Sequence, residues 1–171
     1  MKALVVYESF FGNTERVARA IKEGLSGQCE VELVDVAQAA ELDTEPFDLL
    51  VVGGPTHAFS MSRVSTREEA VNKGASQGST SFGLREWLEH LSKGRHSERV
   101  AAFDTRVSRV RHLPGSAAKG AAKVARGLGY PTAAQAESFY VADVSGPLLD
   151  GELERAHAWG EWLAKQLVPA G

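Results

Sequence analysis

The chain has 171 residues, 43% hydrophobic and 24% charged, which is the composition of an ordinary globular protein with one sizeable core. A net charge of −3 is too small to indicate a strongly charged partner, and a single cysteine, Cys29, excludes an internal disulfide framework. No apolar stretch reaches membrane length, and the N-terminal apolar run is too short for a secretory signal. We therefore expect a cytoplasmic protein that forms one domain over residues 1–168.

The first half of the chain predicts two kinds of strand around one helix. Lys2–Tyr7 is a continuous, valine-rich apolar run, which is typical of a strand buried on both faces. From Thr14 the apolar residues recur at helical spacing, and Gly27 is suited to end that helix. Residues 29–36 alternate between apolar and polar, which predicts a half-exposed strand at the edge of the sheet.

A second buried strand, Phe47–Val52, is followed by Gly53, Gly54 and Pro55. The connection after it, residues 57–80, is long, and long connections are more often functional than short ones. Within it, Ser65 and Glu68 have capping-box spacing and Gly74 is suited to end the short helix that they would start.

The remaining elements continue the alternation of strands and helices. They are a helical stripe from Leu84 to Leu91, a buried strand at Arg99–Asp104, an alanine-rich helix at Ser116–Leu128, a strand at Gln135–Ala142 and a helix that Asp150 would cap. This order predicts an α/β protein, a three-layer α-β-α sandwich around a parallel sheet. Ligands bind such sheets at the carboxyl ends of the strands, here after Tyr7, Val52 and Phe103.

The loop at the first of these places, Ser9–Thr14, has the residue types of a phosphate site. We call it the first loop; it leads directly into the first helix, whose N-terminus offers unpaired N–H groups and a partial positive charge. Gly12 permits a close approach of the backbone, and Ser9, Asn13 and Thr14 supply short polar side chains. Because the loop has no lysine, a terminal monophosphate fits it better than a nucleoside triphosphate.

The first loop resembles that of the flavodoxin-like family, which reads roughly Thr/Ser-x-Thr-Gly-x-Thr after the first strand. Ser9, Gly12 and Thr14 match this pattern, whereas Phe11 stands where many members have a third hydroxyl. Flavin reductases with a looser Ser-x-x-Gly-Asn-Thr loop are more similar still. The resemblance covers nearly the whole chain, and it implies a five-stranded parallel sheet of order 2-1-3-4-5 that binds FMN without a covalent bond.

Two further loops carry the resemblance. The second loop, residues 53–62, reads GGPTHAFSMS and is similar to the family's first flavin-ring loop; Phe59 or Met61 would cover one face of the ring or else fix the loop to the core. The third loop, residues 103–116, would meet the polar edge of the ring. The resemblance implies the following cofactor-binding residues, with no catalytic and no metal-binding residue: Ser9, Phe10, Phe11, Gly12, Asn13, Thr14, Pro55, Thr56, His57, Ala58, Phe59, Asp104, Thr105 and Arg106.

Basic side chains collect in the second and third loops and the segment between them. They are Arg63, Arg67, Arg106, Arg109, Arg111 and His112. They form either a solvated rim or a positive field around the flavin. A positive field would favour an anionic electron donor, such as a nicotinamide dinucleotide, or an acidic redox partner protein. The chain lacks a basic helix and an RNA-binding aromatic motif, so we expect no nucleic-acid partner.

Three functions remain open at this stage. The protein carries single electrons between redox proteins, or it is an FMN-dependent reductase that takes hydride from NAD(P)H and reduces a quinone or a similar acceptor. In the third reading FMN binding has been lost and the domain only binds partners. A receiver domain is excluded because Gly53 stands at the position of its phosphorylated aspartate, and a Rossmann dehydrogenase because the first loop lacks Gly-x-Gly-x-x-Gly.

Overall fold

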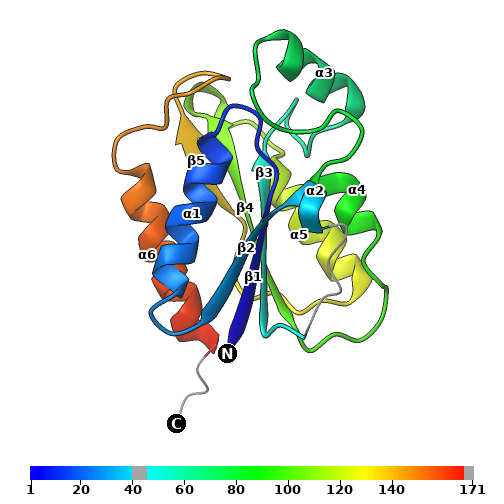
Figure 1. Cartoon of the computed structure of the whole chain (residues 1–171), viewed down its shortest axis with the longest axis vertical. Coiled ribbons are helices and arrows are strands. Elements are labelled where there is room, and N and C mark those ends of the chain that lie inside the picture. The colour runs from blue at the N-terminus through cyan, green and yellow to red at the C-terminus, as the bar shows by residue number, and fades with distance from the viewer. Residues whose placement is uncertain (40–45, 168–171) are drawn as a thin grey trace.

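A computed structural model describes residues 1–39 and 46–167, so the predicted domain end at residue 168 lies outside the described residues. The described part contains one parallel sheet of order β2-β1-β3-β4-β5, which confirms the predicted topology (Figure 1). The strands are β1 (Lys2–Tyr7), β2 (Glu30–Asp35), β3 (Leu49–Pro55), β4 (Arg99–Val107) and β5 (Glu137–Val141).

Helices cover both faces of the sheet, which completes the predicted three layers (Figure 1). One face carries α1 (Asn13–Leu25) and α6 (Glu152–Leu167), and the other carries α2 (Val36–Ala39), α4 (Leu84–Glu89) and α5 (Ala117–Leu128). A further helix, α3 (Val64–Asn72), lies beyond the carboxyl-terminal end of the sheet. No helix in residues 1–39 or 46–167 has both the length and the apolar character needed to cross a membrane.

The alternation of side chains along each strand divides the core in two. In β1, Ala3 and Val5 pack toward α1 and α6, whereas Leu4 and Val6 pack toward α4 and α5. All four are buried, as predicted for a strand covered on both faces. β2 lies at the edge of the sheet with alternating exposure, which also agrees with the sequence.

The helices α1 and α6 approach each other closely through two glycines. A Cβ atom on Gly24 would lie 2.1 Å from the carbonyl oxygen of His157, and one on Gly160 would lie 2.3 Å from that of Ile21. No larger side chain fits at either position. This contact fixes α1, whose N-terminus opens the first loop, against the rest of the layer.

Two strands are longer than the sequence predicts. Gly53, Gly54 and Pro55 belong to β3, where they pair with Phe103, Asp104 and Thr105, and β4 continues to Val107. The prediction placed these residues in loops because glycine and proline usually end a strand. Here Gly53 is needed within the strand: a Cβ atom on it would lie 2.2 Å from the ring of Phe103, which packs across it.

The short helix in the long connection also begins differently from the prediction. α3 starts at Val64, and the hydroxyl of Thr66 accepts a hydrogen bond of 2.9 Å from the backbone N–H of Arg63. The predicted capping box of Ser65 and Glu68 is therefore wrong. Gly74 ends the helix as predicted, with φ +91.

A fully buried arginine organises the long connection between β3 and α4 (residues 56–83). Nε of Arg67 donates to the hydroxyl of Ser62 at 2.8 Å, and Nη2 donates to Oε2 of Glu86 at 2.5 Å. Ser62 in turn donates to Oε1 of Glu8 at 2.7 Å, and Oε2 of Glu8 lies 3.5 Å from Nε of Arg67. Glu8 follows β1 directly, so this network joins the long connection to the end of the central strand.

A second set of contacts joins the same connection to the first loop. The backbone N–H groups of Ser76 and Gln77 donate to the carbonyl of Phe10 at 3.1 and 3.2 Å. Gly78 lies against the ring of Phe10 so closely that a Cβ atom there would be 2.5 Å from it. The long connection therefore supports the first loop from behind.

The network generates a stability prediction. Replacing Arg67 by Met removes the cation that Glu8 and Glu86 face, and breaking a buried ion pair from one side costs about 3–5 kcal/mol. We expect the Arg67→Met variant to lose that much unfolding free energy in urea titrations.

The matched control is Arg63→Met, since Arg63 is exposed four residues earlier in the chain. This variant should change stability by less than about 0.5 kcal/mol, as is usual for exposed positions. Equal losses in the two variants would show that the buried ion pair does not hold the long connection.

Candidate functional site

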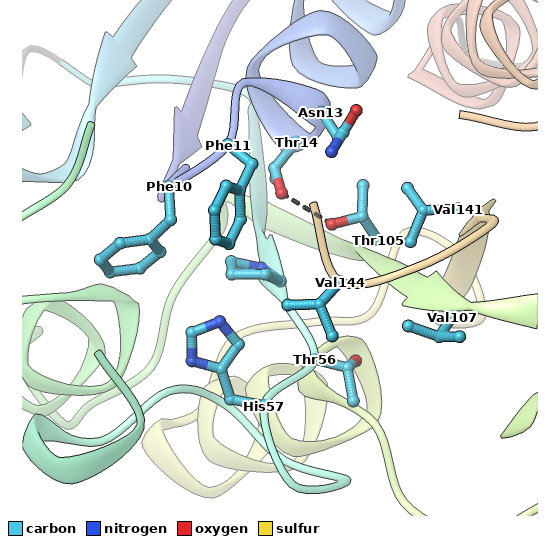
Figure 2. A pocket seen from close by; sticks show the side chains of 11 residues that line it. Phe10, Phe11, Asn13, Thr14, Thr56, His57, Thr105, Val107, Val141 and Val144 are labelled. Atoms are coloured by element: carbon cyan, nitrogen blue, oxygen red, sulfur yellow. Dashed lines mark hydrogen bonds between the residues drawn. The ribbon is translucent and has the colours of Figure 1, made fainter. Parts of the chain in front are cut away.

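A pocket lies at the carboxyl end of the sheet, where the sequence predicted the site. Its lining residues surround about 430 Å³ of space, part of which is open solvent, and Figure 2 shows their side chains. Eight of the predicted cofactor-binding residues line it. They are Phe10, Phe11, Asn13, Thr14, Pro55, Thr56, His57 and Thr105.

The first loop presents a row of free backbone donors. Gly12 is the N-cap of α1 and has φ +89, a left-handed conformation that glycine adopts without strain. In the described part of the chain, no hydrogen-bond acceptor faces the backbone N–H groups of Phe11, Gly12, Asn13 and Thr14. Four such donors at the positive end of a helix form a site for an anion of phosphate size.

The side chains of the first loop hold it in place. Thr14 and Thr105 are buried, and their hydroxyl oxygens are 2.7 Å apart, which joins the start of α1 to the end of β4 (Figure 2). Nδ2 of Asn13 donates to the carbonyl of Ser145 at 3.2 Å. Ser9 is buried beneath the loop, where its hydroxyl accepts a long bond of 3.4 Å from the N–H of Glu15.

The two aromatic residues of the first loop have different positions. Phe10 is buried, and its ring centroid lies 5.5 Å from that of His57 at a tilt of 42°. Phe11 is half-buried and its ring points into the pocket (Figure 2). Phe11 therefore supplies an apolar wall at the position where the family pattern has a hydroxyl.

The second loop contains a tight hairpin with two strained residues. The backbones of His57 and Ser60 exchange hydrogen bonds of 2.8 and 3.1 Å, and the residues between them, Ala58 and Phe59, have φ +48 and +63. Such a turn normally takes Asn-Gly. Phe59 is 46% exposed at the tip, whereas Met61 is buried in the core and so fixes the loop.

His57 is held in a defined orientation at the wall of the pocket. Its Nδ1 lies 3.1 Å from the hydroxyl of Thr66. Burial, and then the positive charges of Arg67 and Lys73, lower the pKa of His57 to about 4. The imidazole is therefore neutral at pH 7.

The side chains of Asp104 and Arg106 do not line the pocket. Both residues lie in β4, where neighbouring side chains point to opposite faces, so Thr105 faces α1 while Asp104 and Arg106 face α5. Oδ2 of Asp104 accepts a hydrogen bond of 2.9 Å from Ala118 N–H at the start of α5, and burial raises the pKa of its carboxyl.

Arg106 holds the third loop from inside. Its Nη2 donates to the carbonyls of Val110 and Leu113 at 2.9 and 2.5 Å. Its side chain is buried, as is that of Arg67. Two of the six basic residues predicted to surround the site are thus inside the protein, and the exposed ones are Arg63, Arg109, Arg111 and His112.

A fourth loop, residues 142–148 after β5, also closes the pocket. Val144 from this loop lines the pocket with Val107 and Val141 at the ends of β4 and β5 (Figure 2). None of these three residues was among the predicted site residues, and the strand end that carries Val141 and Val144 was not considered. The rule that ligands bind at carboxyl ends of strands applies equally to β5 and would have indicated this loop.

A second pocket adjoins the first along α3. It holds about 450 Å³ of empty space between the second loop and Thr66, Glu69, Ala70 and Lys73. Thr56, His57 and Val144 line both pockets, so the two are continuous around His57.

The low pKa of His57 generates a prediction. In the unfolded chain the imidazole takes up a proton near pH 6.5, but in the folded protein only near pH 4, so the unfolded state binds more protons between these values. Protonation of His57 should therefore lower the free energy of unfolding by about 1–3 kcal/mol as the pH falls from 6.5 to 4. Above pH 6.5, His57 should not change the stability. Urea titrations of the wild type and His57→Gln across this range would isolate the effect, because the variant lacks it. Parallel pH profiles would contradict it.

Comparisons with known proteins support the expected family. Residues 4–70 match a family model described as a flavodoxin domain, and no curated protein sequence matches the chain. A flavodoxin from the domain Archaea superposes with a TM-score of 0.62 at 20% identity, covering 98% of this chain and 99% of that one.

Two further structures give the same result. Flavodoxin 2 from Bacillus cereus has a TM-score of 0.65 at 17% identity, over 97% of this chain and 99% of its own. A WrbA-like flavodoxin from Agrobacterium tumefaciens has a TM-score of 0.58 at 19% identity, over 97% and 96%. At such identities the structures show the fold, and the matched segment contains β1, the first loop, α1 and the second loop. The protein therefore has a flavodoxin-like fold.

Proposed function

We propose that the protein binds FMN and uses it for electron transfer in the cytoplasm. The observation that carries this proposal is the row of four free N–H groups from Phe11 to Thr14 at the start of α1. A terminal phosphate matches these donors, and the flat pocket beyond them has walls of Phe11, Pro55 and Val144 that suit an aromatic ring.

The residues of the chain bind, orient and shield the cofactor. The first loop would hold the phosphate, while residues of the second loop and the fourth loop, which line the same pocket, would face the ring. FMN, when bound, supplies the redox chemistry, since flavins accept and release electrons whereas the side chains lining the pocket do not. Neutral His57 adds a polar group to the wall without adding charge.

A second candidate function, an FMN-dependent NAD(P)H reductase, is favoured by one observation. The pocket along α3 is continuous with the first pocket, so a planar acceptor such as a quinone would reach the flavin edge from there. Lys73 at its far end suits an anionic group, and Glu69 offsets that charge. The carrier function requires no such compartment.

Flavin retention tests the proposal. Purified protein mixed with FMN and desalted should keep the flavin absorbance spectrum, whereas riboflavin, which lacks the phosphate, should be lost. In the Gly12→Val variant a branched residue at φ +89 is strained by about 1–3 kcal/mol, so the first loop should leave its conformation and FMN should be lost on desalting.

Gly27→Val is the matched control, because Gly27 lies after the other end of α1, has open space around it and lacks a left-handed φ. This variant should retain FMN as the wild type does. Loss of flavin in neither variant would show that the first loop is not the phosphate site. No retained flavin in the wild type would refute the proposed function.

The two candidate functions differ in their response to NADPH. If the protein is a carrier, we expect NADPH under anaerobic conditions to leave the absorbance of bound FMN unchanged. Bleaching within seconds would favour the reductase. A Lys73→Ala variant that keeps FMN but requires more NADPH for bleaching would place the donor in the pocket along α3.

A further inference from the structure

The charge of this protein is distributed very unevenly along the chain. Between Asp104 and Glu137 there is no acidic residue, and this segment carries six positive charges from its arginines and lysines. Because the whole chain has a formal charge of −3, the remaining residues carry −9. The segment forms the end of β4, the third loop, α5 and the connection that leads to β5.

The exposed charges of this segment follow one another along the chain from the third loop onto α5. Arg109 and Arg111 are exposed in the third loop, and Lys119, Lys123 and Arg126 are exposed on α5. The three on the helix have spacings of four and three, so they share one face, opposite the buried alanines of α5. We call these five residues the basic strip.

The basic strip begins at the mouth of the first pocket. Gly115 of the third loop packs against the second loop so closely that a Cβ atom on it would lie 2.6 Å from the carbonyl oxygen of Phe59. Nη2 of Arg109 lies 3.6 Å from Oδ1 of Asp143 in the fourth loop. The third loop is thus between the two loops that form the pocket walls, and α5 extends away from it.

Apolar side chains lie at the pocket end of the strip. Phe59 is 46% exposed and Leu113 is 47% exposed. An apolar centre with arginine beside it is the usual composition of a protein–protein interface. Because these apolar side chains lie beside the mouth of the pocket, they favour a partner that must approach a cofactor there over a nucleic acid or a membrane, for which that position has no advantage.

We propose that the basic strip, with Phe59 and Leu113, is the docking surface for an acidic one-electron redox protein. This proposal rests on the proposed electron-transfer function. It adds the charge of the partner and the face of the protein that the partner covers. The partner's carboxylates would face the five cations of the strip, while its redox centre faces the pocket mouth. At 0.1 M salt, charges farther away than a Debye length of about 10 Å are largely screened, so the cations of the strip would steer an acidic partner to this face more than distant negative charges repel it.

The test uses the FMN-loaded protein and two redox proteins of opposite charge. A reduced, acidic [2Fe–2S] ferredoxin loses one electron, which the bound flavin gains, and stopped-flow absorbance gives the second-order rate constant. We expect this rate constant to fall as salt is added. With basic cytochrome c, which gains one electron from the reduced flavoprotein, the rate constant should be lower at low salt and not fall as salt is added.

A pair of charge reversals gives the decisive comparison. Lys119→Glu with Lys123→Glu should lower the ferredoxin rate constant at least about tenfold at low salt. The matched control is Lys22→Glu with Lys165→Glu, on α1 and α6 of the opposite layer, which changes the net charge equally. It should change the rate constant less than about twofold, and both double variants should keep FMN.

Direct binding separates this proposal from the proposed function. The dissociation constant of the ferredoxin complex, measured with and without FMN, should rise in the strip variant and not in the control. Equal effects of the two double variants, salt-suppressed reaction with cytochrome c, or tighter binding to duplex DNA or anionic vesicles than to ferredoxin would overturn the docking proposal. A protein that binds ferredoxin through the strip but retains no FMN would overturn the proposed function alone.

Discussion

The ion pair between Glu8 and Arg67 is the constraint on which the site depends. Arg67 is fully buried, and removing a cation from water is costly unless every donor finds an acceptor. Its acceptors come from Ser62, Thr80 and Glu86, and its charge lies beside Glu8 at the end of β1. The long connection is therefore not free to move separately from the central strand, and the first and second loops keep one relative position.

The parts of the structure that the sequence predicted are those governed by local pattern. Lys2–Tyr7 is apolar throughout because both of its faces are covered, so it was recognisable as a central strand. Ser9–Thr14 combines a glycine with short polar residues at a helix start, and its four free N–H groups follow from that position. Thr14 and Thr105, distant in sequence, meet because Thr14 lies shortly after β1 and Thr105 lies near the carboxyl end of β4.

The parts that the sequence did not predict depend on contacts between distant segments. β3 continues through Gly53 and Gly54 because neighbouring strands pair with them, and within the paired β4 the side chains of Asp104 and Arg106 point away from the pocket. Nothing in the sequence indicated that Arg67 is buried and Arg63 exposed. The two glutamates that Arg67 faces lie elsewhere in the chain, so no local pattern distinguishes the two arginines. Val144 lines the pocket because β5 pairs beside β4, and its loop was missed because the end of β5 was not among the strand ends considered.

The glycine contact between α1 and α6 has a consequence for ligand binding. Gly24 and Gly160 bring the two helix backbones together, so a displacement of α1 would break a closely packed contact. The conformational entropy of ordering the helix start is therefore lost during folding and not when a ligand arrives. An anion entering the first loop meets donors that are already in position. Less of its binding free energy is therefore spent on ordering the loop, as in any preorganised site.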